Sequence, residues 1–407
     1  MVERNPSPPH EFEEEQDIFR QDMVADTAIS KKWVYQTIVN MCKEVEKQSG
    51  DNDTMDIPED LQDESCRLWD LCVEKQLALF LVEIDATKLL RDVIIDSKSP
   101  RLTEITVGVL GNMACTREAC SHISNDDELK VAVLSLFSCR DSPTLVEMGR
   151  LINTCLADEE SRPVWLDLME SSLLQYMDDL SFILNSSSNC DLLKNILQVL
   201  DICLDSKPSL ISKFSKLNFV NALAEAGLQL SKDDSSIRGL ENCLHTLYIL
   251  TTEESKSKEL FIDQSNVFHM ASNCCQKWST MVDFKVGTNP TDVTVASCLA
   301  IINFILDISS IDKDSTFFNE VSDDEKVYIA DVCHKAKVQC TVSTIDNKDD
   351  EYSSTEENKK ANLSKKASGG DEISTDSGNK DEKDTSYQNI LLLEVVTDLL
   401  NSLDRWK

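Results

Sequence analysis

Cysteine and histidine are the residues of this chain with the widest chemistry, because their side chains bind metals and act as nucleophiles. The chain has 15 cysteines and 5 histidines. They come closest together in two groups: Cys115, Cys120 and His122, and Cys274, Cys275, Cys333 and His334. Neither group has the paired two-residue spacing of structural zinc sites. Most cysteines lie inside apolar runs, where a free thiol behaves as a small hydrophobic side chain. We expect no bound metal and no cofactor.

Catalytic motifs are missing from the sequence. With 10 glycines in 407 residues there is no glycine-rich phosphate loop. The histidines are scattered, and none belongs to a zinc-peptidase helix motif or a recognisable nucleophile–base pair. We predict that the protein is not an enzyme. A metal- or cysteine-dependent enzyme is the minor alternative.

A second set of polar side chains points to binding. These side chains recur in otherwise apolar runs, at a central position or three residues before it, and we call them the polar stripe: Arg67, Asp70, Asn112, Arg150, Asn153, Gln198, Asp201 and His245. Residues three apart lie on one face of a helix. Stacked helices would therefore align the stripe along the inner, concave side, where amides could hold an extended peptide backbone and arginines could read its charges. The alternative is that the stripe only marks the solvated side of each helix.

The runs that carry the stripe repeat along the chain. Their central residues are Asp70, Asn112, Asn153, Asp201, Tyr248 and Asp307. The intervals are about 40 to 60 residues, close to the roughly 40–47 of armadillo and HEAT repeats. Residues 117–123, 127–138 and 144–157 predict three helices within one unit, which favours armadillo over the two-helix HEAT plan. Without sustained strand-like alternation, the pattern predicts an all-α, armadillo-like helical solenoid of about six repeats.

Five segments are expected along the chain. They are a disordered acidic tail at 1–26, an N-terminal helix at 27–50, the solenoid at 58–340, a disordered linker at 341–386 and a C-terminal amphipathic helix at 387–407. The tail and the linker contain too few apolar residues to offset the entropy of ordering. The last helix has one apolar seam, which either caps the open end of the solenoid or binds in trans. The seam residues are Leu392, Val396, Leu399, Leu403 and Trp406.

The charge restricts the partners. The chain has 73 acidic and 40 basic residues and a formal net charge of −33, most of it between residues 27 and 340. This balance disfavours nucleic acid and anionic membranes and favours a protein partner, extended or helical, of basic character. It also keeps a long helical array soluble. The composition predicts no particular oligomeric state.

Cysteine usage and the N-terminal sequence bear on location. Free thiols in apolar runs and a Pro- and Glu-rich start indicate a reducing compartment, nuclear or cytoplasmic. No run of about 18 apolar residues is present, so we expect no membrane span. The basic pairs between Lys359 and Lys366 are candidates for a nuclear localisation signal.

Several stretches resemble one known family. They are PRLTEITVGVLGNMAC at 100–115, DSPTL at 141–145, RNPSPP at 4–9, ISKKW at 29–33, CRLWD at 66–70 and ALFL at 78–81. In these stretches the chain is similar to the SAAL family, the serum-amyloid-A-like or synoviocyte-proliferation-associated proteins. The resemblance implies an armadillo-like helical protein, nuclear or cytoplasmic, that is linked in animals to cell proliferation and has no known catalytic activity.

A narrower resemblance concerns LGNMA at 110–114. It is similar to the third-helix motif of nuclear import receptors, where the asparagine bonds the cargo backbone and a tryptophan precedes it by four residues. The corresponding residues here are Cys66, Gly108, Gly149 and Leu197. The missing aromatic residues make a groove for basic import signals less expected. The predicted function is a non-catalytic intracellular adaptor, and the alternative is an armadillo-type co-chaperone or nuclear transport adaptor.

Overall fold

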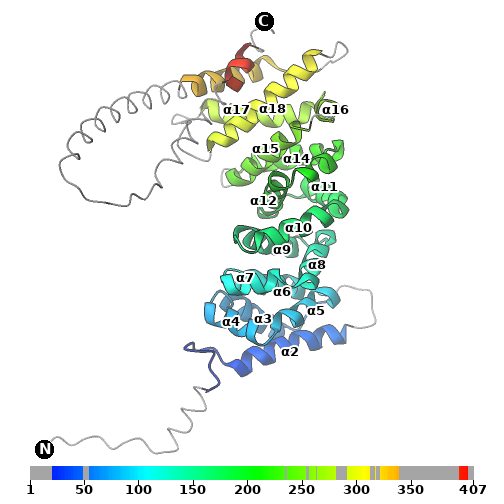
Figure 1. Cartoon of the computed structure of the whole chain (residues 1–407), viewed down its shortest axis with the longest axis vertical. Coiled ribbons are helices and arrows are strands. Elements are labelled where there is room, and N and C mark those ends of the chain that lie inside the picture. Colours follow the sequence, from blue (N-terminus) through cyan, green and yellow to red (C-terminus); the bar gives the residue numbers. More distant parts are fainter. Residues whose placement is uncertain are drawn as a thin grey trace, which may run out of the picture. The chain divides into compact units, whose positions relative to one another are not determined.

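The computed structural model describes residues 21–48, 55–233, 236–253, 256–262, 264–280, 291–311, 317, 321–338 and 394–401. Apart from one isolated bridge between Met23 and Ser30, the regular structure of these residues is helical. The chain divides into two compact units, which are taken separately below: residues 1–180 with 191–207, and residues 181–190 with 208–407. The predicted all-α class is confirmed (Figure 1).

Unit 1 consists of short helices joined by tight breaks. They are α2 (Lys31–Lys47), α3 (Glu59–Leu71), α4 (Lys75–Glu83), α5 (Ala86–Asp96), α6 (Pro100–Met113), α7 (Arg117–Ser124), α8 (Asp127–Ser135), the 3-10 helix η1 (Leu136–Ser138), α9 (Ser142–Ala157), α10 (Arg162–Ser172), the 3-10 helix η2 (Leu173–Tyr176) and α12 (Cys190–Ser206). The next helix after η2, α11 (Met177–Ser186), contains the boundary between the units.

Unit 2 continues the same plan. Its helices are α13 (Pro208–Phe214), α14 (Leu217–Leu230), α15 (Ile237–Thr251), α16 (Ser257–Phe261), α17 (Ser265–Thr280) and α18 (Thr291–Ile311), followed by helical residues 323–338 and 394–401. Along the chain the helices group in threes, with α6, α9, α12, α15 and α18 as third helices. The third helix of each three-helix repeat carries one of the predicted central residues, and so does α3. This three-helix plan confirms the armadillo-like solenoid.

Third helices pack against third helices. In unit 1, α6 lies against both α3 and α9, and in unit 2, α15 lies against α18. Leu68, Leu110 and Leu151 of α3, α6 and α9 are fully buried, as core positions on successive third helices should be. Burial of such side chains contributes about 1.5–3 kcal/mol each. Stacking of the third helices therefore builds much of the core.

Two of these helices begin at side-chain caps that the sequence encodes. Ser99 accepts a hydrogen bond from the backbone N–H of Leu102 at the start of α6, and Asp141 accepts one from Thr144 at the start of α9. A proline follows each cap within the first turn, where its missing N–H costs nothing. Caps of this kind fix where each third helix starts and so set its register against its neighbours.

The start of the chain differs from expectation. Residues 1–20 of the predicted tail lie outside the described residues. Residues 21–26, by contrast, belong to a turn in which the Asp22 carboxylate accepts from Ser30 Oγ (2.5 Å) and the Lys32 backbone N–H (3.0 Å), and in which Val24 is buried. The helix expected at 27–50 is α2, and it packs on α3 and α5. The packed array thus begins at α2, before residue 58.

The end of the chain is described for residues 394–401, whereas the linker expected at 341–386 lies outside the described residues. Residues 394–401 are helical, and Val396 and Leu399 of the predicted apolar seam are fully buried. Unit 2 contains this helix. In the part of the chain that the structure describes, no helix combines the length and the apolar character needed to cross a membrane.

Candidate interaction site on the third helices

The polar stripe occupies the third helices, but its members differ in exposure. In unit 1, Arg67, Asp70 and Gln198 are exposed, Asn112, Arg150 and Asp201 are half-buried, and Asn153 is buried. The last member, His245, is on α15 of unit 2, where its ring stacks on Tyr248 with centroids 6.4 Å apart. The contacts described next bring together the stripe residues of α6 and α9.

Asn112 connects three helices. Its Nδ2 donates to the backbone carbonyl of Trp69 on α3 (2.7 Å), and its Oδ1 accepts from Nη1 of Arg150 on α9 (3.0 Å). Both ends of the carboxamide are thus occupied within the protein. An asparagine in this state holds neighbouring helices in register, and only its second N–H and the second lone pair of its oxygen remain for a peptide.

Arg150 is the second connector. Its Nη2 donates to the carbonyl of Gly108 (3.2 Å) and its Nε donates to Glu147 (2.7 Å). The guanidinium lies over Gly111, where an added Cβ would come within 2.8 Å of Nη2. Glycine at 111 therefore makes room for the arginine. Because Glu147 neutralises the guanidinium, Arg150 presents an ion pair and not an isolated positive charge.

Asn153 belongs to a similar connection between α9 and α12. Its Nδ2 donates to the carbonyl of Asn195 (3.0 Å), and Asn195 returns a bond from its own Nδ2 to the carbonyl of Val146 (3.0 Å). The side chain is 8% exposed, and its Oδ1 has no hydrogen-bond partner among the described residues. Asn195 was missed by the sequence reasoning, because an asparagine outside the two stripe positions gives no periodic signal.

Small residues on α6 and α9 receive side chains from neighbouring helices. A Cβ on Gly108 would lie 2.2 Å from the indole of Trp69, and one on Gly149 would lie 2.8 Å from Cβ of Asn195. These are two of the positions at which the import-receptor pattern expects tryptophan. At both positions the space beside the helix is filled from the adjacent helix, which explains in physical terms why an aromatic residue is absent there.

Two ion pairs lie at the surface of these helices. On α6, Arg101 contacts Glu104 at 2.7 Å, and on α12, Lys194 contacts Asp191 at 2.8 Å. The hydrogen bond that Arg101 donates to Glu104 raises the pKa of Arg101. At the other end of the stripe, the Arg67 guanidinium lies 4.9 Å from the centroid of the Trp33 ring, a cation–π contact. The surface thus combines both signs of charge, although the chain as a whole is acidic.

The cysteine groups have different surroundings. Cys274 and Cys333 are buried, and burial raises the pKa of both thiols, which keeps them protonated and weakly nucleophilic. Cys120 is also buried, but a hydrogen bond with Cys155 lowers its pKa to about 7. His122 Nε2 lies 3.1 Å from the hydroxyl of Thr87. Within the described residues, no cluster of three or more His, Cys, Asp or Glu side chains could hold a metal ion.

The chain is similar in sequence to known proteins. The family model described as the SAAL1 C-terminal domain matches residues 176–405. Protein saal1 of Danio rerio is 35% identical over 279 residues, which cover 65% of this chain and 59% of that protein. Protein SAAL1 of Homo sapiens is 32% identical over 256 residues, which cover 57% of this chain and 53% of that protein. The chain therefore matches little more than half the length of these relatives.

Solved structures with a related architecture include designed proteins. One designed armadillo repeat protein is similar over 65% of this chain and 99% of its own, with 14% sequence identity and a TM-score of 0.41. Another, from computationally designed armadillo repeat proteins for modular peptide recognition, has 15% identity, the same two coverages and a TM-score of 0.42.

Proposed function

Since this chain belongs to the SAAL1 C-terminal domain family, we propose that it is a non-catalytic scaffold that binds a protein segment on α3, α6, α9 and α12. The observation that carries the proposal is the series of side-chain connections between these helices. Bonds from Asn112, Arg150 and Asn153 fix the spacing of successive helices before any partner arrives. A surface fixed in advance loses little conformational entropy on binding.

In this proposal the stripe residues divide into two roles. Arg67, Asp70 and Gln198 are exposed and contact the partner, whereas Asn112 and Asn153 hold the helices that present them. Mixed charge on the surface suits a segment that carries both signs, and the net charge of −33 favours one with a basic excess. The segment is extended or helical.

The broader role follows from the family resemblance. A non-enzymatic scaffold of this family would act in the nucleus or cytoplasm in support of cell proliferation. The nuclear transport alternative is less favoured, because Trp69 and Asn195 fill the places at Gly108 and Gly149. Zinc analysis of the purified protein and a thiol-reactivity profile test the enzyme alternative directly.

The proposal is tested by partner capture from cell extracts with the full chain as bait. The variant Arg67→Glu with Asp70→Lys alters two exposed sites and keeps the net charge. Its matched control is Lys88→Glu with Glu159→Lys, at exposed positions outside the third helices. We expect quantitative mass spectrometry to show specific partners that the first variant loses and the control keeps. Equal capture by both variants would overturn the assignment to these helices.

A further inference from the structure

The outward side of α2 differs from the rest of this acidic chain. Its exposed charged residues are Lys32, Lys43, Glu46 and Lys47. Between them lie two exposed apolar side chains, Tyr35 (49% exposed) and Val39 (38% exposed). Basic residues around apolar ones, at the first helix of unit 1, form a surface suited to an acidic segment with apolar anchors.

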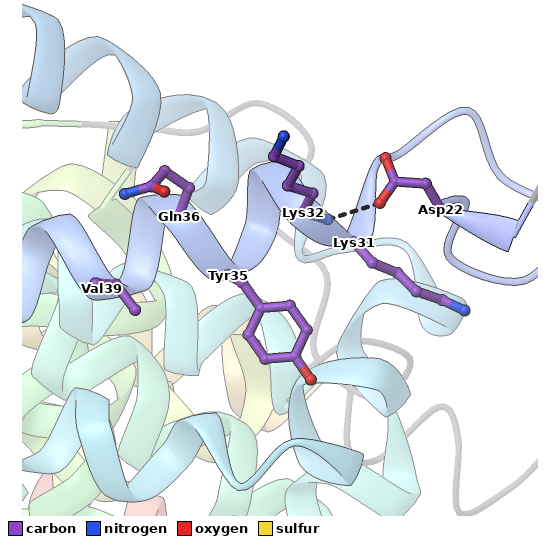
Figure 2. Close-up of a pocket in the computed structure, with 6 residues that line it drawn as sticks. All are labelled: Asp22, Lys31, Lys32, Tyr35, Gln36 and Val39. Atoms are coloured by element: carbon purple, nitrogen blue, oxygen red, sulfur yellow. Dashed lines mark hydrogen bonds between the residues drawn. The ribbon is translucent and has the colours of Figure 1, made fainter. Parts of the chain in front are cut away.

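Part of this surface is hollowed. Figure 2 shows the recess, about 400 Å³ in volume, lined by Asp22, Lys31, Lys32, Tyr35, Gln36 and Val39. The Tyr35 ring is held edge-on against Phe80, with centroids 5.7 Å apart and planes at 88°. This contact fixes the floor of the recess, so an entering side chain meets a prepared apolar wall.

The preceding chain leaves the described structure at the edge of this recess. Lys31 Nζ donates to the carbonyl of Gln21 (3.3 Å), and the Lys31 backbone N–H donates to the carbonyl of Asp22 (2.6 Å). The residues before Gln21 are therefore tethered beside the basic side of α2. A tether of this kind gives the attached segment a high effective concentration at the surface.

The tethered sequence has the complementary chemistry. Residues 11–19 read EFEEEQDIF, which contains five acidic and three apolar residues. Nine extended residues span about 30 Å, whereas the helix from Lys31 to Lys43 rises about 18 Å. The segment is long enough to reach both Tyr35 and Lys43.

We infer that residues 11–19 of this chain bind along the outward side of α2. Phe12, Ile18 and Phe19 supply the apolar groups that cover Tyr35 and Val39, and the carboxylates face the lysines. The contact covers the two exposed apolar side chains of the first helix of unit 1. It is separate from the third-helix surface and stands whether or not that surface binds a partner.

Carbodiimide cross-linking of the full chain tests this inference, because the reagent condenses a carboxylate and an amine in contact into an amide with loss of water. We expect cross-links from carboxylates of residues 11–17 to Lys31, Lys32 or Lys43. Lys88 on α5, which is also exposed, serves as the reference lysine. Raising the salt to about 1 M shortens the screening length to about 3 Å and should reduce the yield.

Two variants test the apolar part of the inferred contact between residues 11–19 and α2. Tyr35→Ser with Val39→Ser, and separately Phe12→Ser with Phe19→Ser, should each lower the yield about tenfold, as loss of a binding anchor does. The second variant leaves the described structure intact. The matched control is Leu89→Ser with Ile95→Ser, which removes exposed apolar side chains from α5 and should leave the yield unchanged.

Mixing chains labelled with different nitrogen isotopes separates contacts within a chain from contacts between chains. Abundant cross-links between differently labelled chains would assign the surface to a second copy and overturn the inference. Cross-links spread equally to Lys88, or unchanged in both serine variants, would also overturn it.

Discussion

Single residues in the third helices act mainly as connectors between neighbours. Asn112 bonds a backbone carbonyl of α3 and a guanidinium of α9, and Asn153 bonds a carbonyl of α12. A hydrogen bond of this kind contributes about 0.5–1.5 kcal/mol, and leaving a buried partner unsatisfied costs about 1–3 kcal/mol. The same side chains that the repeat pattern singles out for binding therefore also stabilise the stack.

Removing both asparagines should destabilise unit 1. We expect Asn112→Ala with Asn153→Ala to lower the free energy of unfolding by about 2–4 kcal/mol, because three inter-helix bonds lose a partner. Urea unfolding measures the loss. The exposed Gln198→Ala is the control and should stay within about 0.5 kcal/mol. A double variant as stable as the parent would mean that both amides are dispensable to the fold.

The glycine at 108 provides a second test. Alanine normally stabilises a helix relative to glycine by up to about 1 kcal/mol. Here the added Cβ would meet the Trp69 indole at 2.2 Å, so Gly108→Ala should instead cost about 1–3 kcal/mol. Repeating the change in a Trp69→Leu background should recover most of the loss. A stabilising effect in the parent background would show that Trp69 moves aside freely.

The positions of the third helices could be predicted from the sequence, because they follow from the apolar period within a single helix. The apolar period located the third helices, and Leu110 and Leu151 from two of its apolar runs are buried. The connections between helices could not be predicted, because Trp69 and Gly108 lie far apart in the chain and the period of one helix does not encode its neighbour's register. For the same reason Asn195 was missed.

At the scale of elements, the helix at residues 394–401 bears on how the apolar surface of unit 2 is covered. Two seam residues, Val396 and Leu399, are fully buried within the described structure. Burial of the seam is what a capping helix requires, and it removes apolar surface that would otherwise be exposed. That this segment is a cap remains a prediction, with binding in trans as the alternative.

Truncating the seam should weaken unit 2. We expect Leu399→Ala to lower the free energy of unfolding by about 2–5 kcal/mol, as for other buried leucines. Glu394→Ala, at an exposed position of the same helix, should change it by less than about 0.5 kcal/mol. Thermal and urea unfolding report the difference. Equal stability of the two variants would show that the helix does not contribute to the core.

For the whole molecule, we propose that a fixed surface on α3, α6, α9 and α12 binds a protein segment. The helical fold and the family of the chain are consistent with this proposal. The partner and the binding energy are properties of the exposed side chains, and neither a repeat period nor a core pattern specifies them.

The most direct test is titration calorimetry of the full chain with a synthetic segment of a captured partner. We predict that Arg67→Glu with Asp70→Lys raises the Kd at least about tenfold while the melting temperature falls by no more than about 4 °C, because both side chains are exposed and the lost Arg67–Trp33 contact is worth only about 0.5–1 kcal/mol. The Lys88→Glu with Glu159→Lys control should bind like the parent. An unchanged Kd in the first variant would show that Arg67 and Asp70 do not contact the partner, contrary to the proposed function.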